Sequence, residues 1–257
     1  MGLILLENLL KNGAESSQIK IIDPKLKDAP NGVESVSSAN NLAQNYVADI
    51  IFLCIKPQDS QEILTEFFKA QKFSKNTIFI SIIAGKKLQF FKNIFGANVK
   101  IVRTMPNLPI LENEGVFAYH FSKNFKEEEK EKAISIFKNF GEIVELKNEK
   151  KFDDFTAIFG SGPAYIFHLQ EIFLEIAKSL EIEEEKSINL VKKLFFGSSM
   201  MSQNSSINFS QLRQSVTSKN GTTEAALEVL QKNDALKKLF TKAVLKAAKK
   251  SKELSNK

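Results

Sequence analysis

Along the first 150 residues, short apolar runs alternate with segments in which apolar residues recur every three or four positions. Such runs are typical of buried strands, and the spaced segments are typical of amphipathic helices, so the pattern predicts a parallel sheet covered by helices. The expected strands are residues 19–22, 50–55, 77–83, 99–102, 116–121 and 143–146. The expected helices between them are residues 42–46, 61–69, 88–95 and 127–140.

Beyond residue 150 the strand pattern stops. Pro163 follows Gly160-Ser161-Gly162 and suits the first position of a helix, after which apolar residues step by three and four along one face. We expect three or four helices there, and their broad apolar faces predict contact with a partner subunit. The fold class is therefore α/β, followed by an all-α domain.

The composition is that of an ordinary soluble chain. Hydrophobic residues make up 43% and charged residues 26% of the 257 positions, and no apolar run reaches membrane-spanning length. The first residues show no basic segment or cleavage site of a secretion signal. The single cysteine, Cys54, excludes an internal disulfide and fits a reducing compartment. These features predict a cytoplasmic protein with no membrane partner.

The net charge of +6 comes largely from lysines near the C-terminus. They alternate with apolar residues at helical spacing, which is typical of the solvated side of an amphipathic helix. No recognisable nucleic-acid-binding motif accompanies them, so we expect no nucleic-acid partner. His120 and His168 are the only histidines and no ligand cluster surrounds them, so we also expect no metal site.

The segment 212–227, LRQSVTSKNGTTEAAL, is rich in hydroxyl groups. Its hydroxyl residues are Ser215, Thr217, Ser218, Thr222 and Thr223, and Asn220-Gly221 supplies a turn before an alanine-rich helix. Unpaired backbone N–H groups at a helix start attract anions, so this segment is a candidate receptor for a small carboxylate. Helix capping alone is the competing interpretation, although one or two such residues suffice for it.

Two further motifs come directly after expected strands. Lys56-Pro57 follows one of them, and residues 102–109, VRTMPNLP, span the end of another. Ligands of open α/β sheets bind at the carboxyl ends of strands, so both motifs lie where a cofactor or substrate is expected. Prolines at these places are also ordinary loop residues.

Four blocks together resemble the pyrroline-5-carboxylate reductase family. They are IKPQ at 55–58, VRTMPNLP at 102–109, GSGPAY at 160–165 and the hydroxyl-rich segment at 212–227, in the family's order and spacing. The resemblance implies a Rossmann-like dinucleotide-binding domain over residues 1–150 and a helical dimerisation and substrate domain over residues 151–257. It also implies NADPH or NADH as cofactor, a homodimer or higher homo-oligomer, and reduction of 1-pyrroline-5-carboxylate to L-proline, the last step of proline biosynthesis.

The resemblance also assigns site residues. Those expected to border the cofactor, largely through backbone groups, are Asn41, Cys54, Ile55, Lys56, Pro57 and Ala84. Those expected to bind substrate are Ser218, Asn220, Gly221, Thr222 and Thr223. The helix start near Thr222 would hold the carboxylate, and Thr223 is the candidate catalytic residue that contacts the ring nitrogen. Tyr165 and Glu171 are expected to support packing.

The chain departs from the family at its start. Met1-Gly2 resemble the last two residues of a GxGxMG turn, and the first strand and the glycine-rich turn of the family do not precede them. We interpret this as a start assigned too late, and we expect the chain as written to bind dinucleotide weakly. Asp23 suits the ribose of NAD, whereas Lys25 suits the 2′-phosphate of NADP, so the sequence leaves the cofactor preference open.

A second departure is Lys219-Asn220, where the family has Pro-Gly. Asparagine tolerates a left-handed backbone, so we expect the turn to be kept. Two other functions remain at this point: a related imine reductase with another substrate, and an N-terminally truncated, non-catalytic dimeric binding protein.

Overall fold

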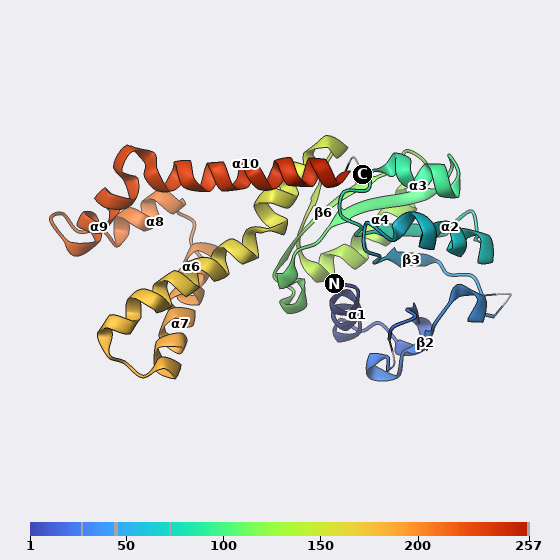
Figure 1. Cartoon of the computed structure of the whole chain (residues 1–257), viewed down its shortest axis with the longest axis horizontal. Helices are drawn as coiled ribbons and strands as arrows, with labels where there is room; N and C mark the ends of the chain where they lie inside the picture. The colour runs from blue at the N-terminus through green and yellow to red at the C-terminus, as the bar shows by residue number, and fades with distance from the viewer. Residues whose placement is uncertain (27, 44–45, 72, 256–257) are drawn as a thin grey trace. The chain divides into compact units, whose positions relative to one another are not determined.

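A computed structural model of the protein describes residues 1–26, 28–43, 46–71 and 73–255 (Figure 1). The chain forms two compact units. The first contains Met1–Ser161 and the C-terminal segment that starts at Ala247, and the second is Gly162–Lys246. The expected domain border, between residues 150 and 151, lies inside the first unit. Dinucleotide binding by residues 1–150, and dimerisation and substrate binding by residues 151–257, stay predictions.

The main sheet lies in the first unit and has five strands among the described residues, in the order β3-β4-β5-β6-β7. All five were expected from apolar runs, with ends that differ by at most three residues. Their bounds are β3 (Ile50–Leu53), β4 (Ile78–Ser81), β5 (Lys100–Met105), β6 (Gly115–Phe121) and β7 (Gly141–Glu145).

One pairing in this sheet is not the parallel one that we expected. β6 runs antiparallel to β5, with Arg103 opposite His120, whereas β3, β4 and β5 are mutually parallel and β7 is parallel to β6. The segment between β5 and β6 is short and contains only the 3₁₀ turn η4 (Leu108–Glu112). A parallel connection needs a crossover of about a dozen residues or more, so this short segment returns antiparallel.

A separate sheet holds two parallel strands, β1 (Lys20–Ile22) and β2 (Glu34–Val36). The ammonium of Lys20 pairs with Glu34 at 2.5 Å across them. β1 was expected, but β2 was missed because Val36 is the only apolar residue in it. In a doubly wound fold a central strand lies between the strands that correspond to β1 and β3. Here β1 and β3 each have one edge without a described strand partner.

Helices cover both faces of the main sheet. The helices of the first unit are α1 (Gly2–Lys11), α2 (Ser60–Ala70), α3 (Leu88–Phe95), α4 (Glu127–Phe137) and α5 (Phe152–Phe155). One core joins α1 and α4 to the face that carries Ile80 and Val102. The other joins α2 and α3 to the face that carries Phe79 and Ile101. Alternate residues of one strand enter different cores because strand side chains alternate.

The helices that follow are α6 (Gly162–Ala177), α7 (Glu184–Gln203), α8 (Phe209–Ser215), α9 (Thr222–Gln231) and α10 (Ala235–Ser255). With α5 they make six α-helices in the described chain beyond residue 150, where we expected three or four. The C-terminal end of α10 belongs to the first unit (Figure 1). There Asp153 accepts hydrogen bonds from the hydroxyls of Ser251 (2.6 Å) and Ser255 (3.1 Å).

Single turns complete the chain. The 3₁₀ turns besides η4 are η1 (Ser16–Gln18), η2 (Pro30–Gly32), η3 (Ala39–Asn41), η5 (Lys138–Phe140), η6 (Glu149–Lys151), η8 (Lys178–Leu180) and η9 (Lys232–Asp234), and η7 (Thr156–Gly160) is a π turn.

The helix expected at residues 42–46 is wrong for the residues that can be assessed. Leu42 is extended, and Ala43 and Tyr46 are not helical, while residues 44–45 lie outside the described residues. The hydroxyl of Ser38 accepts a hydrogen bond from the backbone N–H of Asn40 at 3.3 Å and thereby starts the short turn η3 instead. Local side-chain capping of this kind competes with a longer helix.

Candidate functional site

The hydroxyl-rich segment forms a tight turn between α8 and α9. Asn220 has a left-handed backbone with φ of 59°, and the N–H of Gly221 donates to the carbonyl of Ser218 at 3.0 Å. The expectation that asparagine would keep this turn is confirmed. A Cβ on Gly221 would lie 2.3 Å from the Ser218 hydroxyl oxygen and 3.0 Å from the Ser218 carbonyl oxygen, so a larger residue would displace the Ser218 side chain.

The five hydroxyls of this segment divide into two groups. Those of Ser215 and Thr217 donate to backbone carbonyls of α8, at Leu212 (2.7 Å) and Arg213 (2.6 Å). Those of Ser218, Thr222 and Thr223 have no hydrogen-bond partner in the described part of the chain. The structure therefore leaves free the three hydroxyl residues in the expected substrate set.

The start of α9 is open to an anion. Gly221 occupies the N-cap position and has no side chain to accept hydrogen bonds from the first turn, so backbone N–H groups remain available there. Glu224, which we did not anticipate from the sequence, accepts a hydrogen bond from the N–H of Asn220 at 2.6 Å. Its carboxylate holds the turn on the side of Asn220. The pattern TTE after Gly221 resembles a capping box and could have revealed this role.

The residues expected to border the cofactor follow the carboxyl ends of strands. Cys54, Ile55, Lys56 and Pro57 come directly after β3, and Ala84 lies in the segment between β4 and α3. Asn41 ends η3 after β2, and its amide oxygen accepts a long hydrogen bond of 3.5 Å from the Ser37 hydroxyl. Carboxyl ends of strands are where open α/β sheets bind nucleotides.

The N-terminus of α1 lies against the end of β3. A Cβ on Gly2 would lie 3.0 Å from the Cβ of Cys54, so the glycine allows the helix start to approach this strand closely. Met1 makes no side-chain capping bond, and no acidic residue occupies the first turn. The N-terminal partial charge of α1 is thus not offset by a carboxylate of its own first turn.

The side chain of Cys54 lies against the start of α1, and the residue is exposed to solvent. Desolvation raises the pKa of this thiol to about 12, and the N-terminal ammonium opposes that rise. The thiol is therefore protonated at neutral pH and is a poor nucleophile. Its position after β3 fits a packing or cofactor-bordering residue, and not a reactive cysteine.

We predict that Cys54 reacts slowly with iodoacetamide at pH 8, because the raised pKa leaves little thiolate. Its rate should keep rising with pH beyond 10, whereas the rate for glutathione levels off near its ordinary thiol pKa of about 8.5–9. Mass spectrometry of the alkylated chain over a pH series measures both. A rate for Cys54 that levels off near pH 9 would contradict the prediction.

Arg103 in the VRTMPNLP motif links β5 to η6, α5 and the start of α3. Arg103 is buried on β5, pairs with Glu149 at 3.0 Å and lies over the ring of Phe152 at 4.4 Å. Glu149 also accepts a hydrogen bond from the N–H of Leu88 at 2.7 Å and so holds the first turn of α3. The role of Glu149 was not visible in the sequence, because its partners lie far away along the chain.

Asp23 and Lys25 interact with each other after β1. A carboxylate oxygen of Asp23 accepts a hydrogen bond from the backbone N–H of Lys25 at 2.8 Å, so Asp23 caps this turn. The cofactor preference between NADH and NADPH stays open.

The histidines take structural positions. His120 Nδ1 lies 2.6 Å from the carbonyl oxygen of Leu146, and His168 Nδ1 lies 2.9 Å from a carboxylate oxygen of Glu171 one turn away on α6. Within the described residues no group of three potential metal ligands is found. No described helix is long and apolar enough to span a membrane.

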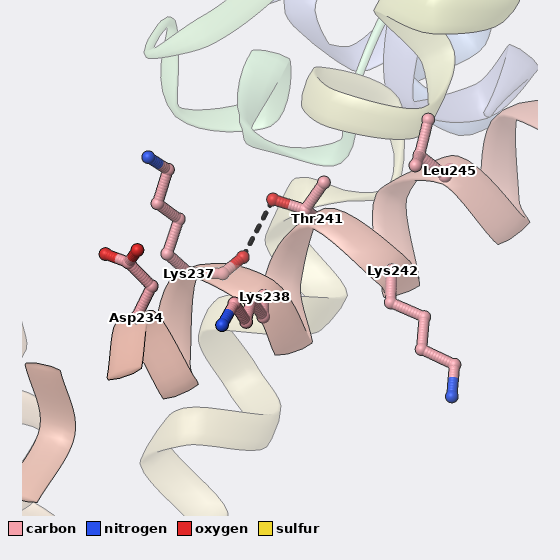
Figure 2. Close-up of a pocket in the computed structure, with 6 residues that line it drawn as sticks. All are labelled: Asp234, Lys237, Lys238, Thr241, Lys242 and Leu245. Atoms are coloured by element: carbon pink, nitrogen blue, oxygen red, sulfur yellow. Dashed lines mark hydrogen bonds between the residues drawn. The ribbon is translucent and has the colours of Figure 1, made fainter. Parts of the chain in front are cut away.

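A shallow hollow of about 450 Å³ lies on the first turns of α10, away from the expected site residues. Figure 2 shows the side chains of Lys237, Lys238 and Lys242 pointing in different directions around it. The hydroxyl of Thr241 donates to the carbonyl of Lys237 at 2.8 Å. Because these polar groups do not converge, the hollow is a weaker candidate than the start of α9.

Two family models match this chain, one in its N-terminal part and one in its C-terminal part. A family model described as pyrroline-5-carboxylate reductase dimerisation matches residues 149–254, and one described as NADP oxidoreductase coenzyme F420-dependent matches residues 1–85. Pyrroline-5-carboxylate reductase of Staphylococcus aureus is 34% identical over 209 residues, which are 81% of this chain and 76% of the relative. The chain belongs to the pyrroline-5-carboxylate reductase family.

Other pyrroline-5-carboxylate reductases agree over almost the whole length. The enzyme of Staphylococcus epidermidis is 30% identical over 251 residues, which are 94% of this chain and 91% of the relative. The solved Plasmodium falciparum pyrroline carboxylate reductase with NADP bound has a TM-score of 0.86 at 30% identity, covering 98% of this chain and 93% of its own. The Coxiella burnetii enzyme has the same TM-score at 29% identity, covering 98% and 94%. The expected fold class, a Rossmann-like domain followed by an all-α domain, is confirmed.

Proposed function

We propose that this chain is an NAD(P)H-dependent pyrroline-5-carboxylate reductase, which reduces 1-pyrroline-5-carboxylate to L-proline in the last step of proline biosynthesis. Membership of the family supports this function. The observation that carries it within the chain is the uncapped start of α9, where the hydroxyls of Ser218, Thr222 and Thr223 have no described partner. Such a group of free donors suits a small carboxylated ligand.

In this proposal the turn and the first turn of α9 bind the substrate. The backbone N–H groups of the first residues of α9, Thr222 and Thr223, hold the carboxylate, and the Ser218 hydroxyl adds a donor. The turn at Asn220 and Gly221, whose own N–H groups bind Glu224 and Ser218, sets the direction of these donors. Thr223 contacts the ring nitrogen. Fixed donors of this kind orient the imine without a strong acid, because the substrate can arrive already protonated on nitrogen. Hydride addition to the imine carbon then gives the neutral secondary amine of proline.

The cofactor is proposed to lie at the carboxyl ends of β3 and β4. Reduced nicotinamide, when bound, supplies the hydride. Two features of these residues suit a dinucleotide. The start of α1 has no side-chain cap and no acidic residue in its first turn, and Gly2 allows this helix start to lie close to the end of β3. Cys54, Ile55, Lys56, Pro57, Ala84 and Asn41 would border the dinucleotide, largely through backbone groups.

The proposed assembly is a homodimer built by the helical unit. Apolar side chains on α6 and η8 are exposed, with Ile176 at 67% and Leu180 at 63%, and Phe209 on α8 is exposed at 79%. An apolar cleft of about 160 Å³ lies between α6 and α7. Monomers rarely leave large apolar areas uncovered, and the family model over this region describes dimerisation. Location in the cytoplasm stays a prediction from the single cysteine.

The test is oxidation of NADPH or NADH, followed at 340 nm, with 1-pyrroline-5-carboxylate as substrate and detection of L-proline as product. We expect turnover that depends on both reactants and a dimer in sedimentation of the same preparation. A cyclic imine with the carboxylate removed serves as the matched control and should react far more slowly, because the start of α9 then has no anion to hold. Equal rates would support a related imine reductase with another substrate.

A second candidate function is that of a non-catalytic dimeric binding protein. Among the described residues no strand pairs with the inner edges of β1 and β3, the position from which a dinucleotide fold usually presents its glycine turn. A dimer that binds substrate but oxidises neither NADPH nor NADH would support a non-catalytic binding protein.

A further inference from the structure

The C-terminal turns of α10 pack on the segment between β4 and α3. The part of α10 from Ala247 onward belongs to the first unit, so this contact lies within one compact unit. A Cβ on Gly85 would lie 3.1 Å from the carbonyl carbon and oxygen of Leu254 and from the backbone nitrogen of Ser255. The last peptide group of α10 therefore lies directly against the backbone of Gly85.

Gly85 suits this contact for two reasons. Its φ of 79° is a left-handed conformation that glycine adopts at little cost. It also has no side chain, and the atoms that a Cβ would meet belong to the backbone, which cannot turn aside as a flexible side chain can. The preceding residue is Ala84, which we expect to border the cofactor. The end of α10 thus reaches the loop that carries Ala84.

A buried carboxylate holds the end of α10 in this place. Asp153 on α5 is 7% exposed and accepts hydrogen bonds from the hydroxyls of Ser251 at 2.6 Å and Ser255 at 3.1 Å. Ser255 shares its proton with the carbonyl of Ser251 at 3.0 Å, so Ser251 is the stronger donor. A carboxylate is costly to bury unless hydrogen bonds satisfy it, and such charge-assisted bonds are stronger than neutral ones. The contact between α10 and α5 is therefore strongly specified.

The same loop is held at its other end by the residues just before α5. A carboxylate oxygen of Glu149 in η6 accepts a hydrogen bond from the N–H of Leu88 at 2.7 Å and pairs with the buried Arg103 at 3.0 Å. Because η6 runs directly into α5, one short segment binds both the start of α3 and the end of α10. The loop between β4 and α3 is thus fixed at Gly85 and at Leu88.

We propose that Asp153 is a positioning residue for the cofactor, because it holds the end of α10 against Gly85 and so fixes the backbone of the loop at Ala84. The inference rests on the proposed function, in which NADPH or NADH lies at the carboxyl ends of β3 and β4. The residues proposed to border the dinucleotide act largely through backbone groups, so the position of this backbone decides how well it binds. A loop that is already ordered loses less conformational entropy when the cofactor arrives.

The test is the double variant Ser251→Ala/Ser255→Ala, which removes both hydroxyls from Asp153. Alanine is the best helix former, so α10 itself is not weakened. We expect the Kd for NADPH, measured by fluorescence titration, to rise about tenfold, on the order of the cost of ordering one loop residue. The kcat at saturating NADPH and the KM for 1-pyrroline-5-carboxylate should stay unchanged. Backbone amides of residues 84–88 should exchange hydrogen faster by a similar factor in the absence of cofactor.

The single variants Ser251→Ala and Ser255→Ala each leave one hydroxyl on Asp153 and should show smaller changes in the same direction. Ser135→Ala is the matched control, because Ser135 lies on α4 of the same unit and donates to the carbonyl of Lys132 in its own helix at 2.8 Å. It should alter neither the Kd for NADPH nor the exchange of the loop. Gly85→Ala is a poorer test, because its left-handed backbone disfavours a side chain whatever α10 does.

An unchanged Kd for NADPH in the double variant would overturn the inference, even if its unfolding midpoint fell, since the role of Asp153 would then be structural. A raised Kd with unchanged exchange at residues 84–88 would also overturn it, because the effect would not act through this loop. If the unaltered chain binds neither NADPH nor NADH, the proposed function fails instead. The exchange rates then decide whether Asp153 fixes the loop, and equal rates in the double variant and the unaltered chain would refute that.

Discussion

Replacement of Thr223 with valine is expected to lower kcat for 1-pyrroline-5-carboxylate about 10- to 1000-fold, by analogy with the loss of one fixed hydrogen-bond donor. Valine keeps the shape of threonine and removes only the hydroxyl. That hydroxyl has no partner in the described chain, so its loss should cost little folding free energy. The measurement is steady-state kinetics of the purified variant, with its unfolding midpoint recorded alongside.

The matched control is Thr217→Val, in the same segment. The Thr217 hydroxyl already donates to the carbonyl of Arg213 at 2.6 Å, so its removal should leave kcat near that of the unaltered chain. Unchanged kinetics in Thr223→Val would refute the assignment of Thr223. Equal losses in both variants would show that the segment responds to any substitution, and would refute it as well.

Addition of a short apolar strand and a glycine-rich turn ahead of Met1 is expected to tighten NADPH binding by about tenfold or more. The estimate corresponds to one additional hydrogen bond to a charged phosphate, about 1.5–3 kcal/mol. The physical reason is the open edges of β1 and β3, between which a parallel strand would pair on both sides. The free energy of unfolding should rise too, because edge strands such as β3, with the sequence IIFL, leave backbone groups and apolar side chains partly uncovered.

Fluorescence titration with NADPH and urea unfolding measure the two effects. The control carries the same extension with proline in the middle of the added strand, since proline cannot donate to a sheet and should cancel the gain. Equal micromolar affinity of the extended and unextended chains would contradict the prediction. Equal gains from the proline control would show that the extension acts without pairing to β1 and β3.

Most of the sheet could be predicted because its strands are continuous apolar runs. Phe79 and Ile80 on β4 enter opposite cores, so both faces demand apolar side chains, and the run is visible without any knowledge of contacts. β2 has Val36 alone as an apolar residue and depends on pairing with β1, so no local pattern reveals it. The antiparallel direction of β6 likewise follows from a short connection and not from the strand itself.

In the motifs, too, some features could be predicted from the sequence and others could not. That Asn220 adopts a left-handed turn follows from residue chemistry, and the structure confirms it. That Ser215 and Thr217 are engaged, and Thr223 is free, depends on where each side chain points relative to α8 and α9. The partner of Asn107 is Phe159, and no spacing in the sequence connects them.

By itself the sequence determined the α/β class, the change to helices after residue 150, the family and the set of candidate site residues. These follow from local periodicity and from motifs whose residue types are required by backbone geometry and chemistry. Only the tertiary structure decided which hydroxyls remain free, that β1 and β2 stand apart from the main sheet, and that the amide of Asn107 donates to the carbonyl of Phe159. These depend on hydrogen bonds between residues far apart along the chain, whose geometry is set only when the strands and helices pack.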